Sequence, residues 1–152
     1  MKYLSLSEVP WLYLDREEPE QEFYIEIIYQ KYVDEDIGEW MRKYCITLPE
    51  YGAEELRTAE KPVVIGRGPG QRLHIYRADQ WKALFEVLET GHSEDKLQRR
   101  MLKRFFYGYA YESEVTERKI YIPEYLIHLL DIKEQAILYK YKIAEETYYT
   151  VY

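Results

Sequence analysis

The sequence predicts an α+β protein made of two pseudo-symmetric β units that are joined by two helices. The first observation is an internal repeat, because Lys119–Leu126 (KIYIPEYL) echoes Cys45–Gly52 (CITLPEYG). The second is that each copy continues with the same series of segments, and the third is that two long helical patterns lie between the copies. A tandem duplication explains this order better than chance does.

Each copy begins with an alternating apolar run that meets a proline, followed by Glu-Tyr and a short helix-compatible segment. Proline suits the start of a helix because its missing N–H would have no partner there. Each half therefore reads as strand, proline-led short helix, strand, turn, strand. The segments after the proline are Ala53–Leu56, Lys61–Ile65 and Leu73–Tyr76 in the first half, and Ile127–Leu130, Glu134–Tyr139 and Tyr149–Tyr152 in the second.

The residues before the repeat, 1–40, predict an N-terminal extension that contains strands. Trp11–Leu14 is strand-like, and the acidic run Asp15–Glu22 is typical of a solvated loop. Phe23–Val33 alternates apolar and polar residues, which predicts a half-buried strand.

Composition limits the classes of protein to consider. With 152 residues, 47% of them hydrophobic, the chain can bury one sizeable core or two small units that share one. The 18 tyrosines favour strands over a purely helical bundle. A net charge of −7 argues against indiscriminate coating of nucleic acid, although a local basic patch can still bind it.

The sequence also predicts a cytoplasmic protein. It contains no apolar run near the roughly 20 residues that span a bilayer, so we expect no membrane partner. The start of the chain does not read as a signal peptide. Its single cysteine, Cys45, excludes an intramolecular disulfide framework and is expected to be a packed thiol.

The glycine-rich segment Gly66–Arg72 predicts a β-hairpin turn, since it lacks the Gly-Lys-Ser/Thr ending of a phosphate-binding P-loop. After the hairpin, Asp79–Glu89 predicts a helix from Trp81, Leu84, Phe85 and Leu88, and Gly91 is placed to end it. Ser93–Asp95 is expected to cap a second helix.

In the second helix, apolar residues occupy one half of the wheel and basic residues the other. The apolar half comprises Leu97, Met101, Leu102, Phe105 and Phe106. The basic half comprises Lys96, Arg99, Arg100, Lys103 and Arg104. Two interpretations stay open: an ordinary solvated face, or a surface for nucleic acid or an acidic partner.

The order of these segments resembles the MraZ family of bacterial transcriptional regulators, which are built from two AbrB-like (swapped-hairpin) motifs. Val63–Gly68, Leu73–Arg77 and the helix with Trp81 look like one passage of the family, and Arg99–Phe106 with Ile120–Pro123 looks like the opening of its second half. The resemblance implies a MraZ-like domain over residues 41–152. Its parts would be a first AbrB-like repeat at 41–76, linking helices at 77–110 and a second repeat at 111–152.

The family's signature is Asp-x-Lys/Gln-Gly-Arg-x-x-Ile-Pro, whose loop and arginine contact DNA. This chain departs from it: Val115, Arg118 and Lys119 stand at the Asp, Gly and Arg positions of the second copy. The first copy has Met41, Tyr44 and Cys45 there. Basic residues still accompany both copies, so the DNA-binding residues implied by the resemblance are Arg42, Lys43, Arg118 and Lys119.

The resemblance makes a DNA-binding transcriptional regulator the leading function, and such a protein would be nucleoid-associated. The alternative is a diverged member without DNA binding that acts as a protein-interaction or assembly module. A third interpretation is an antitoxin-like AbrB partner whose N-terminal extension binds a toxin. In each case we expect a homo-oligomer, because AbrB-like units bury strands against a partner and family members form rings.

The sequence predicts no enzyme, metal site, cofactor or small-molecule substrate. His74, His92 and His128 are far apart and match no metal-ligand spacing. We expect His74 and His128 to be structural or surface residues, and Cys45 has no neighbouring histidine to activate it.

Overall fold

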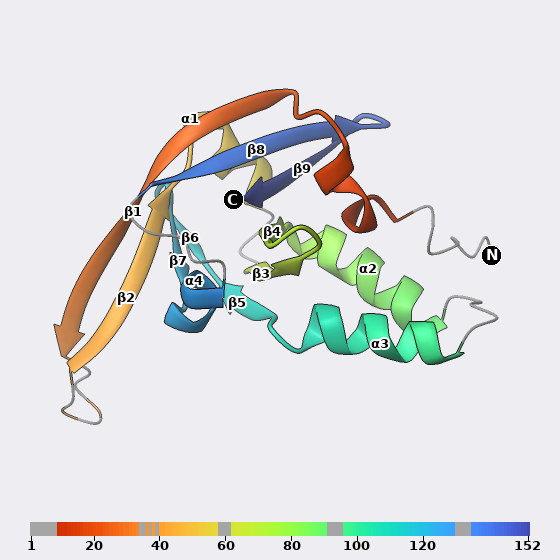
Figure 1. Ribbon diagram of the computed structural model, residues 1–152. Helices are drawn as coiled ribbons and strands as arrows, with labels where there is room; N and C mark the ends of the chain where they lie inside the picture. The colour runs from red at the N-terminus through yellow and green to blue at the C-terminus, as the bar shows by residue number, and fades with distance from the viewer. Residues whose placement is uncertain are drawn as a thin grey trace.

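The computed structural model describes residues 9–33, 36, 38, 40–57, 62–90, 96–129 and 135–152. Within these ranges the fold is α+β, with nine strands in one antiparallel sheet that is nearly closed into a barrel, and four α-helices (Figure 1). In chain order the elements are η2 (Pro10–Leu12), η3 (Leu14–Arg16), β1 (Gln21–Val33), β2 (Trp40–Thr47), α1 (Glu50–Leu56), β3 (Val63–Gly68), β4 (Arg72–Tyr76), α2 (Ala78–Thr90), α3 (Lys96–Tyr107), β5 (Tyr111–Ser113), β6 (Val115–Thr116), β7 (Lys119–Ile122), α4 (Glu124–Leu129), β8 (Gln135–Ile143) and β9 (Glu146–Val151).

The strands follow the order β5-β3-β4-β9-β8-β1-β2-β7-β6. Strand β1 changes partner along its length: residues 21–26 pair with β8, and residues 27–33 pair with β2. At one end of the strand order β5 pairs with β3, and after Glu114 the chain continues as β6, which pairs with β7 at the other end. Ser113 Oγ donates a hydrogen bond to the Tyr121 carbonyl at 2.8 Å. The two ends of the strand order therefore meet, which brings the sheet close to closure.

Apolar side chains form two cores, one on each face of the sheet. The inner core fills the barrel, and the short helices α1 and α4 add Leu56 and Leu126 to it. The outer core lies between the sheet, the helices α2 and α3 and the N-terminal segment at residues 9–14. Its members include Trp11, Tyr76 and Phe106. Helices α2 and α3 and the N-terminal segment therefore cover the face of the sheet near β3, β4 and β9 (Figure 1).

Several local predictions are confirmed. The strand–helix–hairpin series occurs in both halves, with Pro49 as the N-cap of α1 and Pro123 directly before α4. The glycine-rich segment forms the β3–β4 hairpin, in which Gly68 pairs with Arg72. Cys45 is buried, as expected of a packed thiol. The proposed helix end at Gly91 and the cap at Ser93–Asp95 lie outside the described residues, as does His92.

The prediction of a strand at Trp11–Leu14 is wrong. This segment forms η2 and η3, in which the amides of Leu12 and Tyr13 donate to the carbonyls of Val9 and Pro10. Pro10 favours this turn because its φ is already fixed near the helical value. The turn also carries the Trp11 ring onto the sheet, where it is buried against Tyr76 with ring centroids 4.3 Å apart.

The apolar half of α3 is buried only in part. Only Phe106 among its described residues is fully buried, whereas the Leu97 and Met101 side chains are 64% and 62% exposed. The helix has more apolar surface than the sheet and α2 can cover, because it meets the sheet mainly near β3. One apolar row of α3 therefore remains at the surface.

A close contact across the β3–β4 hairpin yields a stability prediction. A Cβ atom added at Gly68 would overlap the ring of His74, which is buried between Trp11, Tyr76 and Phe106. We expect Gly68→Ala to lower the free energy of unfolding by about 2–3 kcal/mol, as overpacking of a core does.

Gly66→Ala in the same strand is the matched control. Its added Cβ would meet the Tyr76 ring at an ordinary 3.6 Å, so we expect a change within about 1 kcal/mol. Urea denaturation of both variants measures the difference. Equal effects at the two positions would contradict the overlap with His74.

His74 also makes the stability of the fold depend on pH. Burial, with the nearby charge of Arg72, lowers the pKa of His74 from 6.5 to about 3, so the folded protein keeps the ring neutral. The unfolded chain binds a proton below pH 6.5 and the folded chain does not, so stability falls as the pH drops from 6.5 towards 3. At pH 5 the loss from this one group is about 2 kcal/mol.

Urea denaturation of the wild type and of His74→Gln at pH 7.5 and pH 5 checks this expectation. The variant lacks the titrating ring, so we expect its stability to fall less between the two pH values than that of the wild type. The same pH dependence in both proteins would show that His74 is not the group responsible.

Candidate nucleic-acid interface

Three exposed cations gather at the β6–β7 turn. The turn consists of Glu117 and Arg118, and Glu117 adopts a positive φ of 59° in place of the glycine that such turns favour. Arg118 and Lys119 are exposed, and so is Arg57, which follows helix α1. The tight turn is therefore present although the sequence lacks the glycine of the family signature.

Hydrogen bonds to the backbone hold two of these cations in place. Arg118 donates from Nε to the Leu48 carbonyl at 3.0 Å, and the Leu48 amide donates to the Arg118 carbonyl at 2.6 Å. Arg57 donates from its guanidinium to the Glu117 carbonyl at 2.5 Å. Each bond uses only part of the donor capacity of a guanidinium, so both groups can still bind an anion. We call Arg57, Arg118 and Lys119 the cationic turn.

Arg42 and Lys43, the other two predicted DNA-binding residues, do not lie at this turn. They lie in β2, where the register places them opposite residues 31 and 30 of β1, and their side chains lie outside the described residues. Lys119 pairs with Thr47 of β2. Thr47 lies four residues after Lys43, which is about 13 Å along the strand. The far ends of β1 and β2 project away from α2 and α3 (Figure 1). The structure thus brings Arg118 and Lys119 together and leaves the pair in β2 apart from them.

The predicted basic face of α3 divides into two parts. Lys103 forms an ion pair with Glu89 of α2 at 3.0 Å, and the Tyr107 hydroxyl donates to the same carboxylate at 3.2 Å. The hydrogen bond from Lys103 holds the pKa of Glu89 below its usual value, and the charge of the half-buried Arg99 acts in the same direction. Arg99 and Lys103 are therefore partly neutralised by α2.

The other part of the α3 face is an exposed basic row of Lys96, Arg100 and Arg104. Successive members are four residues apart, which is about 6 Å along a helix. The exposed apolar residues Leu97 and Met101 are on the same helix. This arrangement combines positive charge with apolar surface, unlike the cationic turn.

Arg57 is not among the site residues predicted from the sequence. It follows the repeated motif and has no periodicity of its own, so only the tertiary fold brings it to the Glu117 carbonyl, 60 positions later. Two weak signals were available: its charge, and its place directly after the predicted short helix.

Other chemistries find little support in the described parts of the chain. His74 shares a 2.8 Å hydrogen bond with the Tyr76 hydroxyl and is buried, as expected of a structural histidine, whereas His128 is exposed on α4. Among the residues that the structure describes, no group of three His, Cys, Asp or Glu side chains could hold a metal ion. No helix in these ranges is long and apolar enough to cross a bilayer.

The comparisons with family models and with curated proteins identify no relative of this chain. No family model matches the chain, and no curated protein matches it.

Proposed function

We propose that the barrel consists of two pseudo-symmetric, AbrB-like swapped-hairpin units, as in the MraZ family. The strand registers support this. Ile46 and Ile120 each stand three residues before the proline of their repeat, and they pair with one another between β2 and β7. His74 and Thr150 stand at the second position of the matching runs Leu73–Tyr76 and Tyr149–Tyr152, and they pair between β4 and β9. A two-fold axis between the halves requires such pairing of equivalent residues.

The exchange of strands between the halves is the second argument. Strand β1, which lies before the first copy of the repeat and pairs with β2 over residues 27–33, also pairs with β8 of the second half over residues 21–26. The leading strand of the second half, β5, pairs with β3 of the first. Each half thus completes the sheet of the other, which is the arrangement that a swapped-hairpin unit implies.

We propose further that the chain is a DNA-binding protein and a transcriptional regulator of the MraZ type. The cationic turn is the observation that carries this proposal. Lys119 stands at the arginine position of the family's DNA-contacting signature, and Arg57 and Arg118 supply the forked guanidinium groups that bind phosphate oxygens. Phosphate contacts of this kind fix a protein on the duplex without reading its sequence. The net charge of −7 restricts such contact to this local patch.

The test is the salt dependence of DNA binding. For each phosphate contact removed by Arg118→Ala or Lys119→Ala, the slope of log K against log salt concentration should fall by about one unit. Fluorescence anisotropy with a labelled duplex from the gene's own upstream region measures the slope, and a scrambled duplex measures specificity. Tighter binding to the upstream duplex is expected of a regulator.

Lys142→Ala, which removes an exposed cation from β8, is the control and should leave the slope unchanged. If Arg100→Glu weakens binding more than Lys119→Ala does, the basic row of α3 is the contact instead. Absence of binding by the wild type at low salt would overturn the proposal and favour the second candidate below.

The second candidate is an interaction or assembly module without DNA binding, and the exposed apolar row of α3 favours it. Met101 and Leu97 each keep more than half of their side-chain surface in contact with solvent. Apolar residues exposed together on one helix are typical of a protein interface. We propose that this row is an interface between copies of the chain, since ring formation is what the MraZ resemblance implies.

Sedimentation or light scattering of Met101→Glu tests the interface. We expect the wild type to have a mass that is a multiple of 18.6 kDa at micromolar concentration, and the variant to dissociate, because a charge in an apolar interface is costly to desolvate. Gln135→Glu adds the same charge at an exposed position of β8 and should leave the mass unchanged. A wild type of 18.6 kDa would exclude the assembly.

A further inference from the structure

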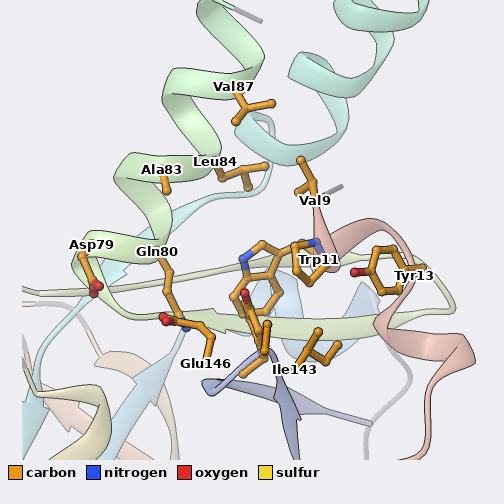
Figure 2. A pocket seen from close by; sticks show the side chains of 13 residues that line it. Val9, Trp11, Tyr13, Asp79, Gln80, Ala83, Leu84, Val87, Ile143 and Glu146 are labelled. Atoms are coloured by element: carbon orange, nitrogen blue, oxygen red, sulfur yellow. The ribbon is translucent and has the colours of Figure 1, made fainter. Parts of the chain in front are cut away.

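A cavity of about 490 Å³ lies between the N-terminal segment, helix α2 and the β8–β9 turn (Figure 2). Neither proposed function uses it. Its volume falls in the range of ordinary small-molecule sites. The lining residues that decide its chemistry are Trp11, Asp79, Gln80, Leu84, Glu146 and Tyr148.

The apolar wall of the cavity is built on a rigid aromatic cluster. Trp11 packs against Tyr76 and meets the edge of Tyr148, with ring centroids 4.3 and 4.9 Å apart. Trp11 is 3% exposed, and Leu84 on the opposite side is also buried. In Figure 2 the Trp11 ring faces α2, which carries Leu84 and Val87. Because these side chains are fixed by the outer core, a ligand would not have to order them.

The polar edge of the cavity is a network of hydrogen bonds. Gln80 is 6% exposed, accepts from the Arg77 amide at 3.1 Å, and donates to the Thr147 carbonyl at 2.6 Å and to Glu146 Oε1 at 3.2 Å. Arg77 forms ion pairs with both Asp79 and Glu146. These bonds to Glu146 all end on Oε1, so Oε2 can accept from a ligand.

The charge balance at this edge is negative. One guanidinium faces two carboxylates, and its hydrogen bond holds the pKa of Asp79 below the usual value. Burial, and then the carboxylate of Glu146, raises the pKa of Tyr148 to about 12, so its hydroxyl remains neutral near pH 7. The described residues that line the cavity include no lysine, arginine or histidine. A cation is therefore favoured over an anion.

We propose that this cavity binds a small organic cation with an apolar body, such as an aromatic or branched aliphatic amine. The ammonium group lies at Glu146 and Asp79, and the apolar body lies between Trp11, Tyr148 and Leu84. Aromatic faces attract a cation through their ring electrons, which adds to the attraction of the carboxylates. Since the N-terminal segment forms one wall, the ligand also links this segment to α2.

Three probes of similar size test the proposal: 2-phenylethylammonium, neutral 2-phenylethanol and anionic phenylacetate. We expect the ammonium to bind at least about tenfold more tightly than the alcohol, and the anion to bind least, as attraction of roughly one ion pair predicts. Two-dimensional amide NMR titration of the full chain gives the affinity. It also locates the probe through the Trp11 indole and Gln80 side-chain signals. Equal affinity for all three probes, or no binding at millimolar concentration, would overturn the proposal.

Glu146→Gln keeps the shape of the site and removes the charge. We expect this variant to bind the ammonium about tenfold more weakly and to bind the alcohol with unchanged affinity. Glu145→Gln changes an exposed residue of the same turn, which does not line the cavity, and should have no effect. An equal loss in both variants would indicate a general effect of surface charge and contradict the site.

A second pair of variants tests the position of the site. Ala83→Phe places a ring in the cavity from an exposed position of α2, so it should abolish ammonium binding while the helix is preserved. Glu86→Phe introduces the same ring on α2 at an exposed residue that does not line the cavity, and should still bind the probe. Binding that survives in Ala83→Phe would place the ligand elsewhere. None of these outcomes depends on whether the chain binds DNA.

Discussion

Closure of the barrel depends on two segments that each change their hydrogen-bonding partner partway along. β1 leaves β8 and continues beside β2, and on the opposite side the chain passes from β5 on β3 to β6 on β7. An open sheet would leave rows of unpaired amides and carbonyls along its edges. By sharing each segment between two partners, the chain brings the two ends of the strand order together around a single apolar interior.

The second layer depends on the first. The sheet exposes an outer face at β4, where His74 and Tyr76 lie, and this face is covered by α2, α3 and the N-terminal segment. The fit is tight at the β3–β4 hairpin, since His74 covers Gly68. The packing of the covering layer on the sheet is looser beside the β8–β9 turn, where it leaves the cavity. The two proposed sites therefore lie in different parts of the fold. The cationic turn is part of the barrel, and the cavity lies in the layer that covers the barrel.

Local signals predicted much of the fold. The proline-led helices, the glycine-rich hairpin and the helix over residues 78–90 depend on neighbours in the sequence, and the expected patterns identified them. The prediction for Trp11–Leu14 failed because a short apolar run has no period that distinguishes a strand from a turn, and packing on Tyr76 decided the conformation. The face of α3 was assigned from periodicity, which marks apolar residues but does not say how many of them a neighbour will cover.

The amino-acid sequence by itself determined the repeat, the order of its elements and the charge of the candidate residues, because these are properties of segments a few residues long. Tertiary structure alone decided which of those residues meet. Arg57 joins Arg118 through contacts between separate segments, and Lys43 lies apart from Lys119 because the register of β2 on β7 sets the distance along the strand. The cavity arises in the same way, since residues from η2, α2 and the β8–β9 turn meet only when the barrel has closed and its outer face is covered. Contacts between distant segments depend on strand register and packing, which no local pattern encodes.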